Sequence, residues 1–154
     1  VLVYKYFLVI LLIVVDFVTK KIIFNYIDLN SFISILPFLD LTHIHNYGIS
    51  FGLFAGLIPP WIIIVIGSVI SFLILYMVIQ SNNKIEKWGL ILIMAGAISN
   101  IIDRLINNYV LDFIYIHYKD FYWPAFNFAD IYITFGALMI IYQLFNEFKN
   151  KLAK

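Results

Sequence analysis

Long apolar segments alternate with shorter polar stretches along the chain. A helix that spans a membrane needs about 20 mostly apolar residues. Four segments meet or nearly meet that length, and they cover about residues 6–27, 61–79, 88–106 and 129–145. The pattern predicts an all-α membrane protein with four transmembrane helices, in a single integral membrane domain that comprises residues 1–154.

The composition supports a membrane protein and excludes several other classes. Apolar residues make up 64% of the chain and charged residues only 12%, whereas soluble domains carry about 25% charged residues. The net charge of +1 offers no electrostatic attraction for nucleic acid. Because the chain has no cysteine, it has no disulfide, no thiol nucleophile and no thiolate metal site.

The first apolar segment could instead be a signal peptide, because Lys5 precedes its apolar run. It is longer than such peptides, however, and no small-residue cleavage site follows it. We therefore interpret this segment as a membrane helix.

Positive charges gather on one side of the four predicted spans. Lysine and arginine near helix ends favour the cytoplasm. Both chain ends and the loop of residues 81–87 share one side, which holds Lys5, Lys84, Lys87, Lys149, Lys151 and Lys154. The two opposite loops, residues 28–60 and 106–128, contain only Lys119. We therefore expect both termini in the cytoplasm and the two long loops outside.

The two outer loops are unusually apolar and aromatic for connections between helices. Residues 39–46 and 109–118 are short stretches with β-branched and aromatic residues, which favour strands. Amphipathic aromatic side chains also prefer the membrane–water interface. We therefore expect strands in these loops, lying on the outer membrane surface.

Ionisable residues inside the predicted spans gather in the outer half of the bilayer, and such residues are costly there and usually functional. A helix rises about 1.5 Å per residue across a core about 30 Å thick. Asp16 then lies roughly 16 Å above Lys5, and Lys20 lies about one turn further out. Counting residues in the same way from the inner ends of the third and fourth spans gives heights of about 18 to 24 Å for Asn100, Asp103, Arg104 and Asp130.

Some of these charges suit a role in holding the helices together. Asp16 and Lys20 are four residues apart with the acid first, which favours a structural ion pair. Arg104 suits a structural or substrate-holding role, because a guanidinium can hold a carboxylate or a backbone carbonyl with several donors. Few cations are then left to neutralise Asp130.

Asp112 lies in the outer loop that precedes Asp130. Two carboxylates brought together share a proton, because like charges raise the pKa of one of them. The ionised carboxylate can activate water while the protonated one polarises a carbonyl, as in aspartic proteases. The spacing leaves open whether the two residues meet, and Asp112 alone could be a solvated loop residue.

Five motifs occur in order along the predicted spans. They are Asp16-Phe17-Val18-Thr19-Lys20, Asn46-Tyr47-Gly48-Ile49-Ser50-Phe51-Gly52, Asn100-Ile101-Ile102-Asp103-Arg104, Val110-Leu111-Asp112-Phe113-Ile114 and Phe126-Asn127-Phe128-Ala129-Asp130. Each motif alone is weak. Taken in order, they make the chain resemble the bacterial lipoprotein signal peptidases, or signal peptidase II, over nearly its whole length.

The resemblance implies an aspartic endopeptidase of the bacterial inner membrane. Such an enzyme removes the signal peptide of prolipoproteins just before a cysteine that carries diacylglycerol, and it needs no metal or other cofactor. Asp112 and Asp130 match the catalytic pair, and Asp16 and Lys20 match a first-helix motif with a structural role. Further motif residues near the site are matched by Asn46, Gly48, Asn100, Asp103, Arg104 and Asn127. The resemblance also implies a small extracytoplasmic β-sheet and a surface helix, both from the outer loops.

Several of these residues have simpler interpretations. Asn46 could hold the substrate backbone or form a turn beside Gly48, and Asn127 could hold substrate or cap the fourth helix. His43 and His45 would share one face of a strand and could bind a metal together with His117. Surface histidines beside lipid headgroups are the simpler interpretation of these three residues.

Other function classes fit the sequence less well. Gly48-Ile49-Ser50 begins like a serine-nucleophile motif, but Ser50 lies in a loop and no histidine lies in a span. A proton or ion pathway would need polar groups in both halves of the membrane. A protein that binds lipoproteins without cleaving them is an alternative that the sequence leaves open. We expect lipid-modified prolipoprotein and membrane lipid as partners, and a monomeric protein.

Overall fold

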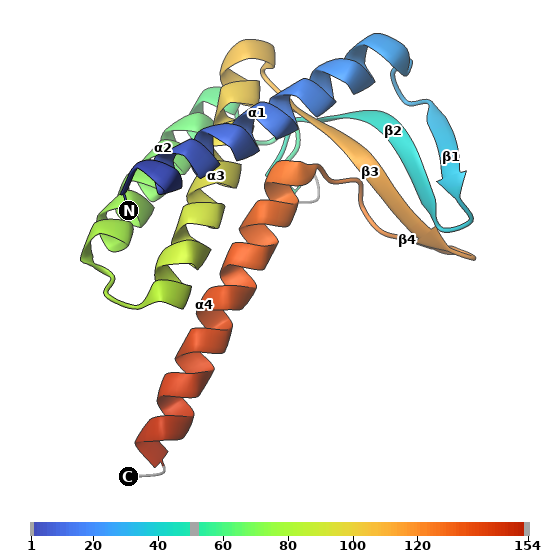
Figure 1. Ribbon diagram of the computed structural model, residues 1–154. Helices are drawn as coiled ribbons and strands as arrows, with labels where there is room; N and C mark the ends of the chain where they lie inside the picture. Colours follow the sequence, from blue (N-terminus) through green and yellow to red (C-terminus); the bar gives the residue numbers. More distant parts are fainter. Residues whose placement is uncertain (1, 50–52, 153–154) are drawn as a thin grey trace.

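The computed structural model describes residues 2–49 and 53–152 as helices joined to one small sheet (Figure 1). The helices are α1 (Leu2–Tyr26), α2 (Pro60–Gln80), α3 (Lys84–Asn107) and α4 (Phe128–Leu152). The strands are β1 (Phe32–Leu36), β2 (Leu39–Asn46), β3 (Val110–Tyr118) and β4 (Phe121–Tyr122). The sheet lies on one side of the bundle, beside the end of α1 and the start of α4 (Figure 1).

Within the described residues, α2, α3 and α4 are long and apolar enough to cross a membrane. The exposed surface of α2 is almost entirely apolar, as lipid contact requires. The helix α1 carries Asp16, Lys20 and Lys21 in its second half, so its crossing of the membrane stays a prediction.

Capping residues extend the third helix beyond its apolar segment. Asn83 accepts hydrogen bonds from the backbone N–H groups of Ile85 and Glu86, so α3 begins at Lys84 and not near residue 88. The helix ends where Asn108 adopts a left-handed conformation, with φ of 65°. The fourth helix also exceeds its apolar segment and projects past the turn between α2 and α3 (Figure 1).

The two outer loops combine into one antiparallel sheet with strand order β1-β2-β3-β4. This confirms the strands that were predicted over residues 39–46 and 109–118, except that β3 begins one residue later than predicted. The register of β2 and β3 is interrupted between Leu41 and Ile44, and it places Ile44 opposite Asp112. Ile23 of α1 and Ile27, which follows the helix, pack on Leu111 and Phe113 of β3. That apolar contact anchors the segment of β3 that carries Asp112.

The surface helix is a correction to the expectation from the resemblance. In the described part of the outer loops, residues 53–58 form turns and a bend, not a helix. Phe54 and Gly56 have φ values of 62° and 76°, and positive φ is incompatible with a right-handed helix. Residues 50–52, and with them Ser50, lie outside the described residues.

The helix α3 occupies the centre of the bundle and packs against the other three helices. Its contact with α4 is very close, because a Cβ atom on Gly96 would lie 2.3 Å from the carbonyl oxygen of Ala129. A Cβ atom on Gly136 would likewise lie 2.4 Å from the carbonyl oxygen of Gly89. Small residues at such crossings let helix backbones approach each other in a membrane.

Candidate active site

A buried carboxylate in α1 connects three helices. Asp16 has no solvent exposure, and its Oδ2 accepts a hydrogen bond of 2.6 Å from the Ser99 hydroxyl. The same oxygen lies 2.7 Å from the Lys20 ammonium. The other oxygen, Oδ1, accepts a bond of 3.0 Å from the backbone N–H of Ala129. Asp16 therefore binds α3 and holds the first turn of α4 in place.

The Lys20 ammonium extends this network toward the outer loops. Its Nζ atom lies 2.7 Å from Oδ2 of Asp103 and donates a hydrogen bond of 3.1 Å to Oδ1 of Asn100. The Lys20 side chain is only 4% exposed, so its three partners substitute for water.

Ser99 and the backbone N–H of Ala129 were missing from the predicted site residues. Ser99 lies one turn before Asp103 on the same helical face. This spacing is the signal that could have found the serine. The sequence offers no corresponding signal for a backbone N–H group on another helix.

The structure places Asp112 on β3 between two asparagine amides. Asn46 of β2 donates a hydrogen bond of 2.9 Å to Oδ2, and Asn127 donates one of 2.6 Å to Oδ1. Burial and then the nearby Asp130 carboxylate raise the pKa of Asp112 from 3.8 to about 7, against the opposing effect of the two amides.

Asp130 lies in the first turn of α4 and is held by two different donors. Its Oδ2 accepts a bond of 3.2 Å from the backbone N–H of Asn127, and its Oδ1 accepts one of 3.0 Å from the Asn100 amide. The Asp130 backbone N–H donates in turn to Oδ1 of Asn127 at 3.0 Å. Asn127 and Asp130 thus form a reciprocal cap at the start of α4.

Asn127 is therefore both a cap and a connection between the two aspartates. Its side-chain oxygen accepts a hydrogen bond from the backbone N–H of Asp130, and its side-chain nitrogen donates one to the Asp112 carboxyl group. The sequence left a cap and a substrate-holding role as alternatives; the structure shows the cap, and the substrate-holding role stays a prediction. Asn127 also donates to both carboxyl groups, to Asp112 through its buried side-chain amide and to Asp130 through its backbone N–H.

Arg104 positions the loop that follows β2. One nitrogen donates a bond of 2.7 Å to the Gly48 carbonyl, and another donates one of 3.0 Å to the Asn100 carbonyl. The Gly48 N–H donates to Oδ1 of Asn46 at 2.9 Å. The guanidinium thus holds backbone carbonyls, and the Asn46 amide is oriented toward Asp112.

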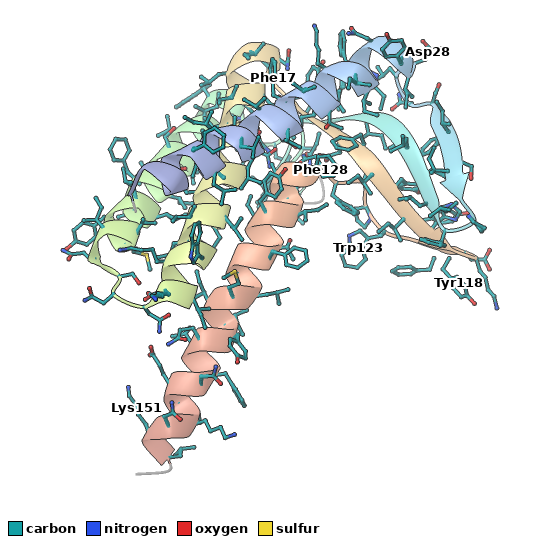
Figure 2. All side chains as sticks on the ribbon, in the orientation of Figure 1. Phe17, Asp28, Tyr118, Trp123, Phe128 and Lys151 are labelled. Atoms are coloured by element: carbon teal, nitrogen blue, oxygen red, sulfur yellow. The ribbon has the colours of Figure 1, made fainter. Side chains whose placement is uncertain are left out.

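Two cavities open at the aspartate pair. One has a volume of about 400 Å³, and Asp130 lines it together with Trp123, Phe126 and Phe135. Trp123 lies between the end of the sheet and the start of α4 (Figure 2). The other cavity, of about 240 Å³, is lined by Asp112, Asn46 and Tyr47 among others. The walls are mainly apolar, so an extended or lipidated chain could lie along them with its backbone at the carboxyl groups.

The three histidines do not converge on one point. His43 and His45 have their Nε2 atoms 3.0 Å apart, and Nδ1 of His43 lies 2.8 Å from the Ile27 carbonyl. His117 lies six residues along β3 from the partner of His45, beside Asp40 at 3.2 Å. Among the described residues, no group of three or more His, Cys, Asp or Glu side chains could hold a metal ion.

Comparisons with known proteins identify relatives of this chain. The family model for signal peptidase (SPase) II matches residues 8–146. The lipoprotein signal peptidase of Thermodesulfovibrio yellowstonii is 39% identical over 134 residues, which cover 86% of this chain and 88% of that protein. The lipoprotein signal peptidase of Wigglesworthia glossinidia brevipalpis is 38% identical over 138 residues, covering 88% and 90%.

A solved structure described as a bacterial membrane enzyme matches with a TM-score of 0.88 and 28% identity, over 96% of this chain and 91% of that chain. A second bacterial membrane enzyme matches with a TM-score of 0.81, also at 28% identity, over 92% of each chain. Since the family model matches most of the chain and the relatives exceed 30% identity, this protein belongs to the signal peptidase II family.

Proposed function

We propose that the protein is an intramembrane aspartic endopeptidase that removes the signal peptide from diacylglyceryl-modified prolipoproteins, cleaving just before the lipidated cysteine. The name of the relatives, lipoprotein signal peptidase, supports the substrate class. The single observation that carries the chemistry is Asn127, whose side-chain amide donates to the Asp112 carboxyl group and whose backbone N–H donates to the Asp130 carboxyl group.

In the proposed reaction, Asp112 holds the proton because of its raised pKa. The ionised Asp130 takes a proton from a water molecule, whose oxygen attacks the scissile carbonyl carbon, while Asp112 donates its proton to the carbonyl oxygen. In the second step the C–N bond breaks and the amine leaves with the proton held by Asp130. Asp112 recovers its proton from the hydroxyl of the tetrahedral intermediate, so both carboxyl groups return to their initial states.

The remaining residues would support this pair. Asn46 and Asn127 hold Asp112, and Asn100 holds Asp130. Gly48 and Arg104 fix the loop beside Asn46, whereas Asp103 joins the Asp16–Lys20 ion pair. No metal or other cofactor takes part in this proposal.

We further propose a monomer in the bacterial inner membrane, with both termini in the cytoplasm. The aspartate pair would then lie near the outer face, at the depth of a lipid-anchored cysteine. The apolar cavities beside Asp112 and Asp130 would receive the lipid and the signal-peptide segment.

A cleavage assay tests the proposed substrate. The purified protein in lipid nanodiscs is expected to shorten a diacylglyceryl-modified prolipoprotein and to leave unchanged the same chain with serine in place of the modified cysteine. The lipid is the recognised feature, because the cavity walls are apolar. Equal cleavage of both chains would contradict lipid recognition. Binding without cleavage would favour a lipoprotein-binding protein, and proton flux in sealed vesicles would favour an ion pathway.

The rate should also depend on pH with a defined sign. Asp112 has a raised pKa, so it is protonated below about pH 7 and loses its acid function above that value. We expect kcat/KM to decrease about tenfold for each pH unit above 7. The profile is measured between pH 5 and 9, with the melting temperature followed over the same range. A rate that stays constant or increases from pH 7 to 9 contradicts the assignment of Asp112 as the acid.

A further inference from the structure

Lys20 has contacts that an ion pair alone would not require. Its three donors have three acceptors, since Asp16 and Asp103 each lie 2.7 Å away and Oδ1 of Asn100 lies 3.1 Å away. The first two contacts neutralise charge. The third contact joins the ammonium to an amide whose other end bonds Asp130 at 3.0 Å.

The ammonium determines which way the Asn100 amide points. An ammonium has only donors, so it must face the amide oxygen. The amide NH₂ group is consequently directed at Oδ1 of Asp130, which must act as an acceptor. An ionised carboxylate accepts on both oxygens, whereas a protonated one must find a partner for its O–H group. The orientation of Asn100 therefore favours the ionised form of Asp130.

The other aspartate of the pair has no such connection. Its amide donors, on Asn46 and Asn127, also favour the ionised form, but they are oriented by the backbone N–H groups of Gly48 and Asp130 and not by a cation. Among the hydrogen bonds of the described residues, the path from Lys20 reaches Asp130 through one amide and does not reach Asp112 in that way.

We propose that Lys20 is a positioning residue for the reaction: through Asn100 it keeps Asp130 as the ionised member of the aspartate pair. The inference rests on the proposed function, because it assigns the base of the proposed reaction. It goes beyond the structural ion pair that the sequence favours for Asp16 and Lys20.

Other charged groups also act on Asp130, and they do not provide the same selection. Asp16 of α1 opposes the ionised form, as does Asp112 of β3. Arg104 of α3 acts on both members of the pair, and its hydrogen bonds to Asn100 and Gly48 go to backbone carbonyls. Lys20 also acts on Asp112 at longer range, but among the described residues its hydrogen-bonded path leads through Asn100 to Asp130. Its removal should therefore change the difference between the pKa values of the two carboxyl groups.

Two variants separate positioning from helix packing. Asn100→Leu removes the connection and leaves both ion pairs of Lys20 in place. Lys20→Met combined with Asp103→Asn removes one positive and one negative charge together, so the net charge of the network is unchanged and Asp16 keeps its bonds from Ser99 and the Ala129 N–H. Asp103→Asn alone is the matched control, because it keeps the contact between Lys20 and Asn100.

We expect both test variants to lower kcat by about 10- to 100-fold with little change in KM, as found for groups that orient a functional residue. The acidic limb of the rate profile should move to higher pH by about one unit, since Asp130 loses support for its ionised form. The control should keep the wild-type position of that limb. If folded Asn100→Leu or the folded double variant keeps the wild-type kcat and limb, Lys20 has only a structural role and the proposal is overturned.

A second measurement does not depend on cleavage. The carboxylate band of Asp130 can be assigned by infrared difference spectroscopy against Asp130→Asn. It should disappear at a higher pH in Asn100→Leu than in wild-type protein. An unchanged midpoint overturns the proposal even if the double variant fails to fold. A wild-type protein that does not cleave lipidated substrate would instead contradict the proposed function, and the infrared result would still decide whether the connection through Asn100 supports the Asp130 charge.

Discussion

Asp112→Asn and Asp130→Asn are each expected to lower the cleavage rate by about 10³-fold or more while the protein stays folded. An asparagine keeps the shape of the side chain but can neither hold nor transfer the proton. Both carboxyl groups are needed because one activates water and the other protonates the carbonyl oxygen. A gel-shift assay on lipidated prolipoprotein measures the rate, and thermal unfolding measures the stability of each variant.

The control for this pair is Asp40→Asn. Asp40 is also a strand aspartate, but it lies toward the far end of the sheet and pairs with His117. This variant should cleave at nearly the wild-type rate. If Asp112→Asn or Asp130→Asn is folded and cleaves within a few-fold of the wild-type rate, that residue is not part of the catalytic pair.

Gly96→Ala is expected to destabilise the protein by about 3 kcal/mol or more and to lower the cleavage rate strongly. The new Cβ atom would lie 2.3 Å from the Ala129 carbonyl oxygen and 2.8 Å from Cγ1 of Ile133. A backbone oxygen cannot rotate away as a side chain can, so α4 must shift. The first turn of α4 carries Asp130 and the N–H group that Asp16 holds, so the aspartate pair should move with it.

Gly67→Ala is the matched control for the helix contact. Its Cβ atom would meet only the flexible side chain of Ile101, at 3.2 and 3.3 Å. Alanine also favours a helix over glycine by about 1 kcal/mol at either position, so only the contact differs. Unfolding in detergent and the cleavage rate should both stay near wild type for Gly67→Ala. A Gly96→Ala variant as stable and as active as Gly67→Ala would contradict the close packing of α3 on α4.

The local features of this protein follow from local physics and were visible in the sequence. Apolar segments of membrane length predicted the helices, and aromatic and β-branched stretches predicted β2 and β3. The resemblance implied a surface helix, and the described residues form turns there because Phe54 and Gly56 have positive φ. The apolar pattern also missed the first turn of α3, because a side-chain cap at Asn83 can begin a helix in a polar stretch.

The composition of the site was also largely accessible from the sequence, since charged residues inside apolar segments are rare enough to be noticed. Helix rise alone predicts that Asp16, Lys20, Asp103, Arg104 and Asp130 share one half of the membrane. Their partners could not be assigned, because a depth along a helix axis does not say which side chains face each other.

Hydropathy and spacing by themselves determined the membrane class, the positions of most elements and the charged residues within the apolar segments, whereas the motif resemblance supplied Asn46, Gly48 and Asn127. Only the tertiary structure decided how these residues connect. The pairing of β2 with β3 brings Asn46 to Asp112, and the close contact of α3 with α4 brings Asn100 to Asp130. Both contacts join residues far apart in the chain and depend on the packing of whole elements, to which local sequence patterns are insensitive.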